Sequence, residues 1–158
     1  MKLESFLANK EERKTKMKKI ITILMLSLFS TIANADGHAK ANAFAITLKV
    51  PASDVAKVEE MLKTHHKWMK ETHPMTGEKK LNSYSILKGP EWNNPADPSQ
   101  GMTGNMYFIL TEYYENPAGF QNHQELGSKW PMIQEFQQML FSYVVGYTFP
   151  GTTIATID

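Results

Sequence analysis

The alternation of apolar and polar residues along the chain predicts several short β-strands. In residues 43–50, the side chains of Phe44, Ile46 and Leu48 fall on one face of an extended chain. Similar patterns predict strands over residues 81–88, 105–114 and 143–149, with a short fifth strand over residues 152–157. The turn-forming residues between the second and third strands, residues 89–104, predict a long loop.

Two further segments carry apolar residues at the spacing of an α-helix. The first helix is predicted over residues 55–72, because Pro74 disfavours the α conformation in the residue before it. The second starts at residues 116–117, an Asn-Pro pair that supplies a cap and then a proline at the first helical position. A Gly-Ser pair at residues 127–128 interrupts this helix, which restarts through residues 130–140.

The order of these elements is β-α-β-β-α-β, which predicts an α+β protein with the ferredoxin-like fold. In that fold both helices lie on one face of an antiparallel sheet. The third strand is apolar or aromatic on both faces, with Phe108 and Leu110 on one and Tyr107 and Ile109 on the other. One of these faces has no helix to cover it, so we expect a second copy of the chain to pack there as a homodimer.

The first 35 residues have the layout of a secretory signal peptide. A lysine-rich start precedes an apolar run over residues 20–29, and the segment closes with the small-x-small sequence Ala33-Asn34-Ala35. We therefore expect cleavage after Ala35, a single domain over residues 36–158, and a periplasmic or secreted bacterial protein with no stable membrane anchor. An uncleaved amphipathic anchor is the alternative. Met17 begins a complete signal sequence of its own, which makes it a candidate for the true start.

Removal of the leader changes the charge of the protein. The full chain has a net charge of +1, whereas residues 36–158 hold ten lysines, no arginine and thirteen acidic residues, a net charge of −3. This composition disfavours nucleic acid and phosphate as ligands. The chain has no cysteine, so disulfides, thiolate catalysis and cysteine-ligated zinc are excluded.

Three of the five histidines lie between residues 65 and 74, but their spacing does not fit a chelating metal site. On a helix, His65 and His66 point about 100° apart, and His66 and His73 lie about 10 Å apart. A chelating helical pair has four-residue spacing, which is not present here. We therefore predict no metal site and expect His66 and His73 to be solvated.

His65 and His123 are the candidate catalytic residues. His65 continues the apolar stripe of its helix through Leu62 and Met69, so it should face the sheet. There it is either a structural imidazole, bonded to a backbone carbonyl or a tyrosine, or a base that acts on a ligand. His123 is either a structural histidine near a helix end, a general base, or the axial ligand of a haem.

The segment TEYYENPAGFQNHQELGSKWPMIQEF, residues 111–136, contains Phe120 and His123 in a helix, followed by Trp130 and Phe136. It resembles the antibiotic-biosynthesis-monooxygenase-like group of the dimeric α/β-barrel superfamily. That resemblance implies a dimer whose sheets close into a barrel, with a pocket between each sheet and its helices. Some members of the group are cofactor-free oxygenases that act on aromatic polyketides, others bind or degrade haem, and many have no assigned activity.

The leading hypothesis is thus an exported homodimer that binds a small apolar or aromatic organic molecule and acts as a cofactor-independent monooxygenase. Tyrosine and methionine side chains suit the wall of such a pocket. The candidate substrate-binding residues are Met69, Tyr84, Tyr107, Trp130 and Phe136. Two alternatives remain open: a non-catalytic carrier of a fatty-acid-like or aromatic ligand, and a haem-binding protein. Against haem, residues 36–158 offer only lysines to meet its propionates.

Overall fold

The structure is a computed structural model and describes residues 42–155. The predicted leader, its cleavage site and the alternative start at Met17 lie outside these residues. Along the chain the elements are β1 (Ala43–Val50), the 3₁₀ turn η1 (Ala52–Asp54), α2 (Val55–Thr72), β2 (Leu81–Trp92), the 3₁₀ turn η2 (Pro98–Gln100), β3 (Met102–Tyr114), α3 (Pro117–Gly127), α4 (Ile133–Tyr143) and β4 (Val144–Gly151). The described part of the predicted fifth strand, residues 152–155, is not a strand, so that prediction is wrong for these residues.

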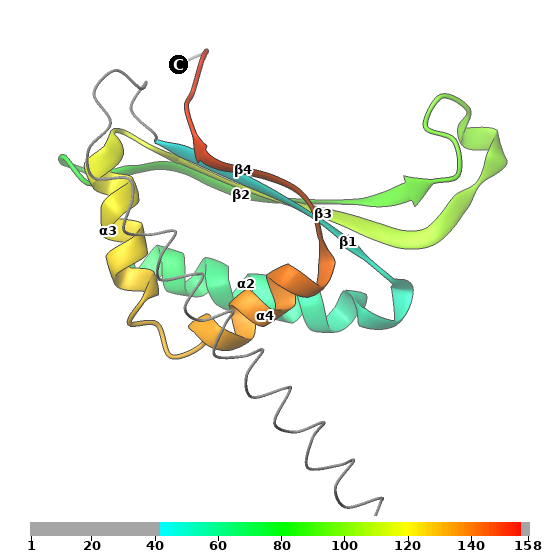
Figure 1. Cartoon of the computed structure of the whole chain (residues 1–158), viewed down its shortest axis with the longest axis horizontal. Helices are drawn as coiled ribbons and strands as arrows, with labels where there is room; N and C mark the ends of the chain where they lie inside the picture. Colours follow the sequence, from blue (N-terminus) through cyan, green and yellow to red (C-terminus); the bar gives the residue numbers. More distant parts are fainter. Residues whose placement is uncertain (1–41, 156–158) are drawn as a thin grey trace, which may run out of the picture. The chain divides into compact units, whose positions relative to one another are not determined.

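The four strands form one antiparallel sheet in the order β2-β3-β1-β4. Helices α2, α3 and α4 lie together on one face of this sheet, and the other face carries no element of the described chain (Figure 1). The protein is therefore α+β, and its arrangement is compatible with the predicted ferredoxin-like fold. None of the helices within residues 42–155 is long and apolar enough to cross a membrane.

The hydrophobic core lies between the sheet and the helices, and the predicted alternation places its residues. Ile46, Leu48 and Val50 of β1 are at most 4% exposed, and Phe108 and Leu110 continue the same face on β3. Helix α2 contributes residues one or two turns apart, and α3 and α4 add aromatic side chains. The buried apolar residues from the helices and from the link between α3 and α4 are Val58, Leu62, Trp68, Met69, Phe120, Trp130, Phe136 and Met139.

The loop predicted over residues 89–104 is instead largely a β-hairpin that extends beyond the other strands (Figure 1). The ladder continues through the pair Pro90 and Met106 as far as Trp92 and Met102. Proline is tolerated because β2 is at the edge of the sheet, where one side of the strand needs no hydrogen-bond donor. The prediction of a loop is therefore wrong at both ends and holds only for the turn between the strands.

One carboxylate, that of Glu91, holds the base of this hairpin. Its two oxygens accept hydrogen bonds from Lys49, Thr103, Asn105 and Tyr107, over distances of 2.5 to 2.9 Å. These donors, with that of Asn105 first, lower the pKa of Glu91 to about 2. The ionised carboxylate of Glu91, with its four hydrogen-bond donors, thus joins the hairpin to the rest of the sheet.

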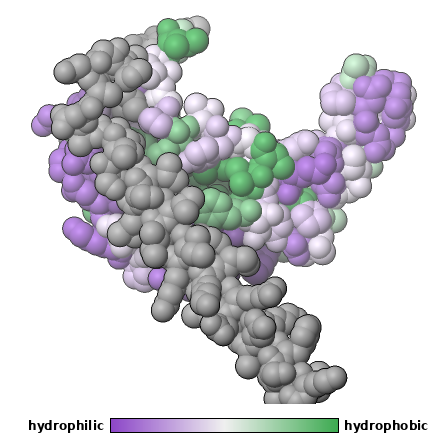
Figure 2. All heavy atoms as spheres, in the orientation of Figure 1, coloured by the Kyte–Doolittle hydropathy of each residue, from purple (hydrophilic) through white to green (hydrophobic). Residues whose placement is uncertain are grey.

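Large apolar side chains remain exposed away from the core. Figure 2 shows hydrophobic residues gathered near the middle of the described domain, where β4 and the end of α4 face the viewer, and hydrophilic residues at the hairpin tip. The exposed apolar residues of α4 and β4 include Phe141, Val145 and Tyr147, each more than half exposed. On β2, Leu87 is 60% exposed and pairs with Ile109 of β3. Both of these lie on the sheet face that no helix covers.

Candidate functional site

Three histidines meet between the sheet and the helices. His65 is 2% exposed on α2, His73 is 6% exposed at the C-terminal cap of the same helix, and the His123 side chain is 18% exposed on α3. The ring centres of His65 and His123, the two candidate catalytic residues, lie 6.3 Å apart. The structure therefore brings the two together across two helices.

The prediction that His73 is solvated is wrong. Pro74 ends the helix as expected, but the chain turns to an extended conformation at His73, which directs its side chain inward against the ring of Trp68. His66 is exposed, as predicted, and its ring centre lies 5.4 Å from that of Tyr84. His73 instead becomes the direct neighbour of His123, with 3.0 Å between His73 Nε2 and His123 Nδ1.

The hydrogen bonds around His73 determine which ring nitrogens carry protons. The hydroxyl of Thr72 donates to the carbonyl of Trp68 at 2.7 Å, so it must accept from His73 Nδ1 at 3.0 Å. A neutral His73 with hydrogen on Nδ1 has its lone pair on Nε2, which accepts from His123 Nδ1. His123 is then left with an unprotonated Nε2, and no hydrogen bond from the described residues reaches that atom.

A buried acid, Glu112, stands beside this pair of histidines. Its Oε2 lies 3.5 Å from His123 Nδ1 and accepts a short hydrogen bond from the hydroxyl of Tyr114. The other carboxyl oxygen, Oε1, is buried and has no partner within residues 42–155. Glu112 was not among the sequence candidates, although a signal was present: it continues the core-facing alternation of Phe108 and Leu110 on β3.

Burial shifts the protonation of the whole cluster toward neutral forms. Desolvation lowers the pKa of His73 to about 4 and that of His123 to about 3, and holds the pKa of His65 well below its usual value. Desolvation also raises the pKa of Glu112 to about 8, against the smaller opposing effect of the hydrogen bond from Tyr114. At neutral pH the site therefore contains neutral imidazoles next to a protonated carboxyl group.

Aromatic rings surround His65. Its ring stacks on Phe136 at 4.3 Å between centres, and Trp130 lies at 5.5 Å. Its Nδ1 is 2.9 Å from the hydroxyl of Tyr84, whose pKa burial raises, so the phenol keeps its proton. Three of the candidate substrate-binding residues thus gather at His65, and a fourth, Met69, is 1% exposed one helical turn further along α2.

The fifth candidate, Tyr107, lies elsewhere. It is on the uncovered sheet face, where its hydroxyl donates to Glu91 at 2.9 Å. Alternation along β3 explains the difference, because odd-numbered positions there face away from the helices, whereas Glu112 and Tyr114 face toward them. The five candidates therefore do not line one pocket.

The start of α3 fixes the position of His123. The side chain of Asn116 accepts from the amide of Ala118 at 2.8 Å and so caps the helix, as the Asn-Pro pair predicts. One residue further along, Gly119 approaches the chain before β2 very closely. A Cβ atom at Gly119 would lie 3.2 Å from the carbonyl oxygens of Lys79 and Lys80, so this close contact favours glycine.

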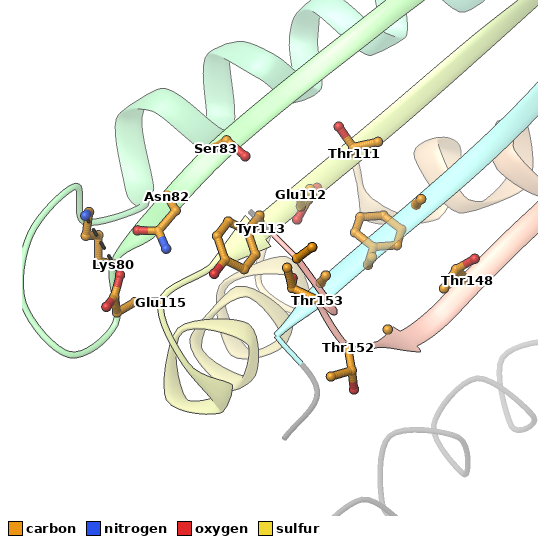
Figure 3. Close-up of a pocket in the computed structure, with 15 residues that line it drawn as sticks. Lys80, Asn82, Ser83, Thr111, Glu112, Tyr113, Glu115, Thr148, Thr152 and Thr153 are labelled. Atoms are coloured by element: carbon orange, nitrogen blue, oxygen red, sulfur yellow. Dashed lines mark ion pairs between the residues drawn. The ribbon is translucent and has the colours of Figure 1, made fainter. Parts of the chain in front are cut away.

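A depression of about 970 Å³ lies on the uncovered face of the sheet, at the end where β3 finishes (Figure 3). Its lining includes small and hydroxyl-bearing residues, namely Ala43, Ala45, Ser83, Thr111, Tyr113 and Thr148. An ion pair between Lys80 and Glu115, 3.9 Å apart, stands at its margin. Its lining also includes Phe44 and Glu112, both of which lie beside His123.

In chemical terms the cluster combines a base, a proton donor and apolar walls. His123 Nε2 can accept a proton or bind one metal or haem iron, and Glu112 can donate a proton from a carboxyl group that burial keeps neutral. The aromatic rings near His65 favour an apolar or aromatic ligand. Comparison of the chain with known proteins finds no family model, no curated protein and no solved structure that matches it.

Proposed function

We propose that the protein binds a small apolar or aromatic organic molecule beside His123 and removes a proton from it, as a cofactor-independent monooxygenase does before oxygen reacts. The resemblance of residues 111–136 to the monooxygenase-like group suggests this class of reaction. The cluster of His73, His123 and Glu112 supports it, because it holds a neutral imidazole that can accept a proton at His123 Nε2 beside aromatic rings.

The observation that carries the proposal is that hydrogen bonds fix which ring nitrogen of His123 carries the proton. Its Nδ1 is committed to His73 at 3.0 Å, so the free lone pair is on Nε2. Its side chain is 18% exposed, whereas His65 and His73 are almost fully enclosed. An entering ligand would therefore meet His123 first, and the ring centres of Trp68 and Phe44 lie 5.6 and 6.3 Å from that of His123.

The reaction would begin when an acidic C–H or phenol of the ligand gives its proton to His123 Nε2. The carbanion that remains transfers electrons to dioxygen and forms a hydroperoxide, which becomes a ketone when it loses water. This sequence needs the ligand, dioxygen and a base. The hydroperoxide takes its proton from water, because the Glu112 side chain has no exposed surface from which to reach the ligand.

A titration with anthrone, an aromatic ketone with an acidic C–H, tests the proposal. Quenching of tryptophan fluorescence would report binding, because Trp68 and Trp130 stack at 5.0 Å beside the site, and an oxygen electrode would report turnover. We expect oxygen uptake by the protein, its loss in His123→Ala with binding retained, and no change in His66→Ala, an exposed histidine on α2. Binding without oxygen uptake by the unaltered protein would favour the carrier alternative, and no binding at all would contradict both.

Haem binding is the second candidate, and one observation favours it. Haem-ligating histidines bind iron through one ring nitrogen while the other donates a hydrogen bond. His123 meets the second condition through His73 and has its Nε2 free. Addition of haemin to the purified protein should then give a Soret band that His123→Ala removes, and no Soret band would exclude this candidate.

We also infer that a second copy covers the uncovered sheet face, as in the dimeric α/β barrels. The support is the apolar pair of Leu87 and Ile109 on that face, together with Tyr107 and Tyr113. A sheet face with this composition is stabilised when it is removed from water. Export through the predicted leader belongs to the same proposal, and mass spectrometry of the secreted protein would locate the cleavage site.

A further inference from the structure

We propose that His73 and Thr72 form a proton relay that connects His123 with solvent at the C-terminal end of α2. The inference rests on the proposed function, because the proton carried is the one that His123 takes from its ligand. Sequence spacing gave no indication of it, since the relay joins the end of α2 to the middle of α3.

The relay is a series of hydrogen bonds between adjacent groups. His123 Nδ1 lies 3.0 Å from His73 Nε2, and His73 Nδ1 lies 3.0 Å from Thr72 Oγ1. The Thr72 hydroxyl in turn donates to the carbonyl of Trp68 at 2.7 Å. Thr72 is an exposed residue, whereas His73 is 6% exposed, so the series runs from the interior to the surface.

The direction of these bonds suits outward transfer of a proton. When His123 Nε2 takes a proton, the hydrogen on Nδ1 can move to His73 Nε2. His73 then releases its Nδ1 hydrogen to Thr72 Oγ1, and the original hydrogen of that hydroxyl leaves to water. One proton enters and one leaves, no oxidant is required, and flips of the two imidazole rings restore the starting tautomers.

The groups that face His123 leave the proton few other routes to solvent. Glu112 approaches Nδ1 at 3.5 Å, but its side chain has no exposed surface and its Oε1 has no partner within residues 42–155. The hydroxyl of Tyr114 is committed to Glu112. His65 is a ring neighbour at 6.3 Å between centres, too far for direct transfer. With a ligand over the exposed edge of His123, the path through His73 is the one that reaches the surface.

The test uses the ligand-free protein and nitrogen-15 NMR of the histidine rings. We expect both His73 and His123 to carry hydrogen on Nδ1, and the ring proton of His73 to exchange with water. Thr72→Val, which keeps the shape and removes the hydroxyl, should slow that exchange by about tenfold, equivalent to roughly 1.4 kcal/mol in barrier height. Thr72→Ser should restore it.

A matched control is available on the same helix. Thr64 makes the same type of bond, from its hydroxyl to the carbonyl of Glu60 at 3.0 Å, and within the described residues that hydroxyl is not hydrogen-bonded to a histidine. Thr64→Val should therefore lower helix stability about as much as Thr72→Val and leave the exchange of the His73 proton unchanged. Hydrogen on Nε2 of His73, or equal exchange rates in Thr72→Val and the unaltered protein, would overturn the relay.

Kinetics separate the relay from the proposed function. If anthrone is oxidised, Thr72→Val should lower kcat about tenfold and leave KM unchanged, because the relay gives Thr72 a role in proton transfer and none in ligand binding. An unchanged kcat would overturn the relay while the function stands. If anthrone is neither bound nor oxidised, the function fails, and the NMR measurement still decides whether the proton path exists.

Discussion

The imidazoles of His73 and His123 are 3.0 Å apart although the two residues are 50 positions apart in the chain. One belongs to the end of α2 and the other to the middle of α3, so the pair joins two helices that face the same sheet. Each ring also has a second partner, Thr72 for His73 and Glu112 for His123. The pair therefore lies in a wider polar cluster inside an aromatic core.

The titration of this cluster predicts an optimum in stability near neutral pH. The folded protein holds the pKa values of His73 and His123 at about 4 and 3, below 6.5, so stability rises with pH between about 3 and 6.5. The folded protein holds Glu112 at about 8, above 4.5, so its contribution is complete below pH 4.5 and is lost as pH rises to 8. Up to pH 6.5 the stability gained through the two histidines exceeds the stability lost through Glu112. Between pH 6.5 and 8 Glu112 is the one of these three groups that still titrates, so stability falls.

Glu112→Gln should remove the decline between pH 6.5 and 8. Glutamine keeps the size of the side chain and cannot ionise, so the variant should lose less stability than the unaltered protein over this range. Urea unfolding at pH 6.5, 7.3 and 8 would measure it. Parallel losses in the two proteins would show that Glu112 is not the group that titrates. Glu125→Gln, an exposed site on α3, is the control and should follow the unaltered protein.

A double-mutant cycle should detect coupling between His65 and Tyr84. Tyr84→Phe removes the hydroxyl that lies 2.9 Å from His65 Nδ1 and should cost about 1 kcal/mol in the free energy of unfolding. His65→Leu should cost more, because it also removes the stack on Phe136. The loss of unfolding free energy in the double variant should be smaller than the sum of the losses in the two single variants, by about 0.5–1.5 kcal/mol. Strict additivity would mean that the hydrogen bond does not contribute.

Gly119→Ala should destabilise the protein and disturb the site. The new methyl group would lie 3.2 Å from the carbonyl oxygens of Lys79 and Lys80 and from the Cβ atom of Tyr114, so these backbone and side-chain atoms must give way, at a cost of about 1–3 kcal/mol. Gly89→Ala is the control, because a Cβ atom there meets nothing within 4 Å. Thermal unfolding would compare the two, and equal melting temperatures would contradict the close approach.

The proposed dimer should depend on the uncovered sheet face. Ile109→Lys places a charge in the middle of that face, beside Leu87 and Thr47, and should give a monomer in light scattering after gel filtration. Val145→Lys adds the same charge at an exposed residue of β4 and should leave the dimer intact. A dimer in Ile109→Lys, or a monomer in Val145→Lys alone, would place the interface elsewhere.

The α+β arrangement of the domain could be predicted from the sequence because its strands and helices have clear periodicity. The alternation of Phe108 and Leu110 identifies the core face of β3, whatever element covers that face. The Asn-Pro pair at residues 116–117 identifies the start of α3. The hairpin was missed because glycine and proline suggest a turn wherever they occur. Pro90 is compatible with a strand only at a sheet edge, and the sequence does not show which strand is the edge.

Only part of the site could be predicted from the sequence. Periodicity placed His65 on the inner face of α2, but it carries no information about partners on other elements. The inward turn of His73 depends on one extended residue at the helix end, and its contact with His123 depends on how α2 and α3 pack. Glu112 could have been found by extending the alternation of β3 by one more residue pair.

The base of the hairpin and the interior of the domain respond to acid at different points. Glu91, with a pKa lowered to about 2, keeps its charge and its four donors in strongly acidic surroundings, whereas His73 and His123 gain protons at about pH 4 and 3. Acidification would thus charge the interior first. A protein exposed to an acidic environment would open around its histidines while the outer hairpin still held its shape.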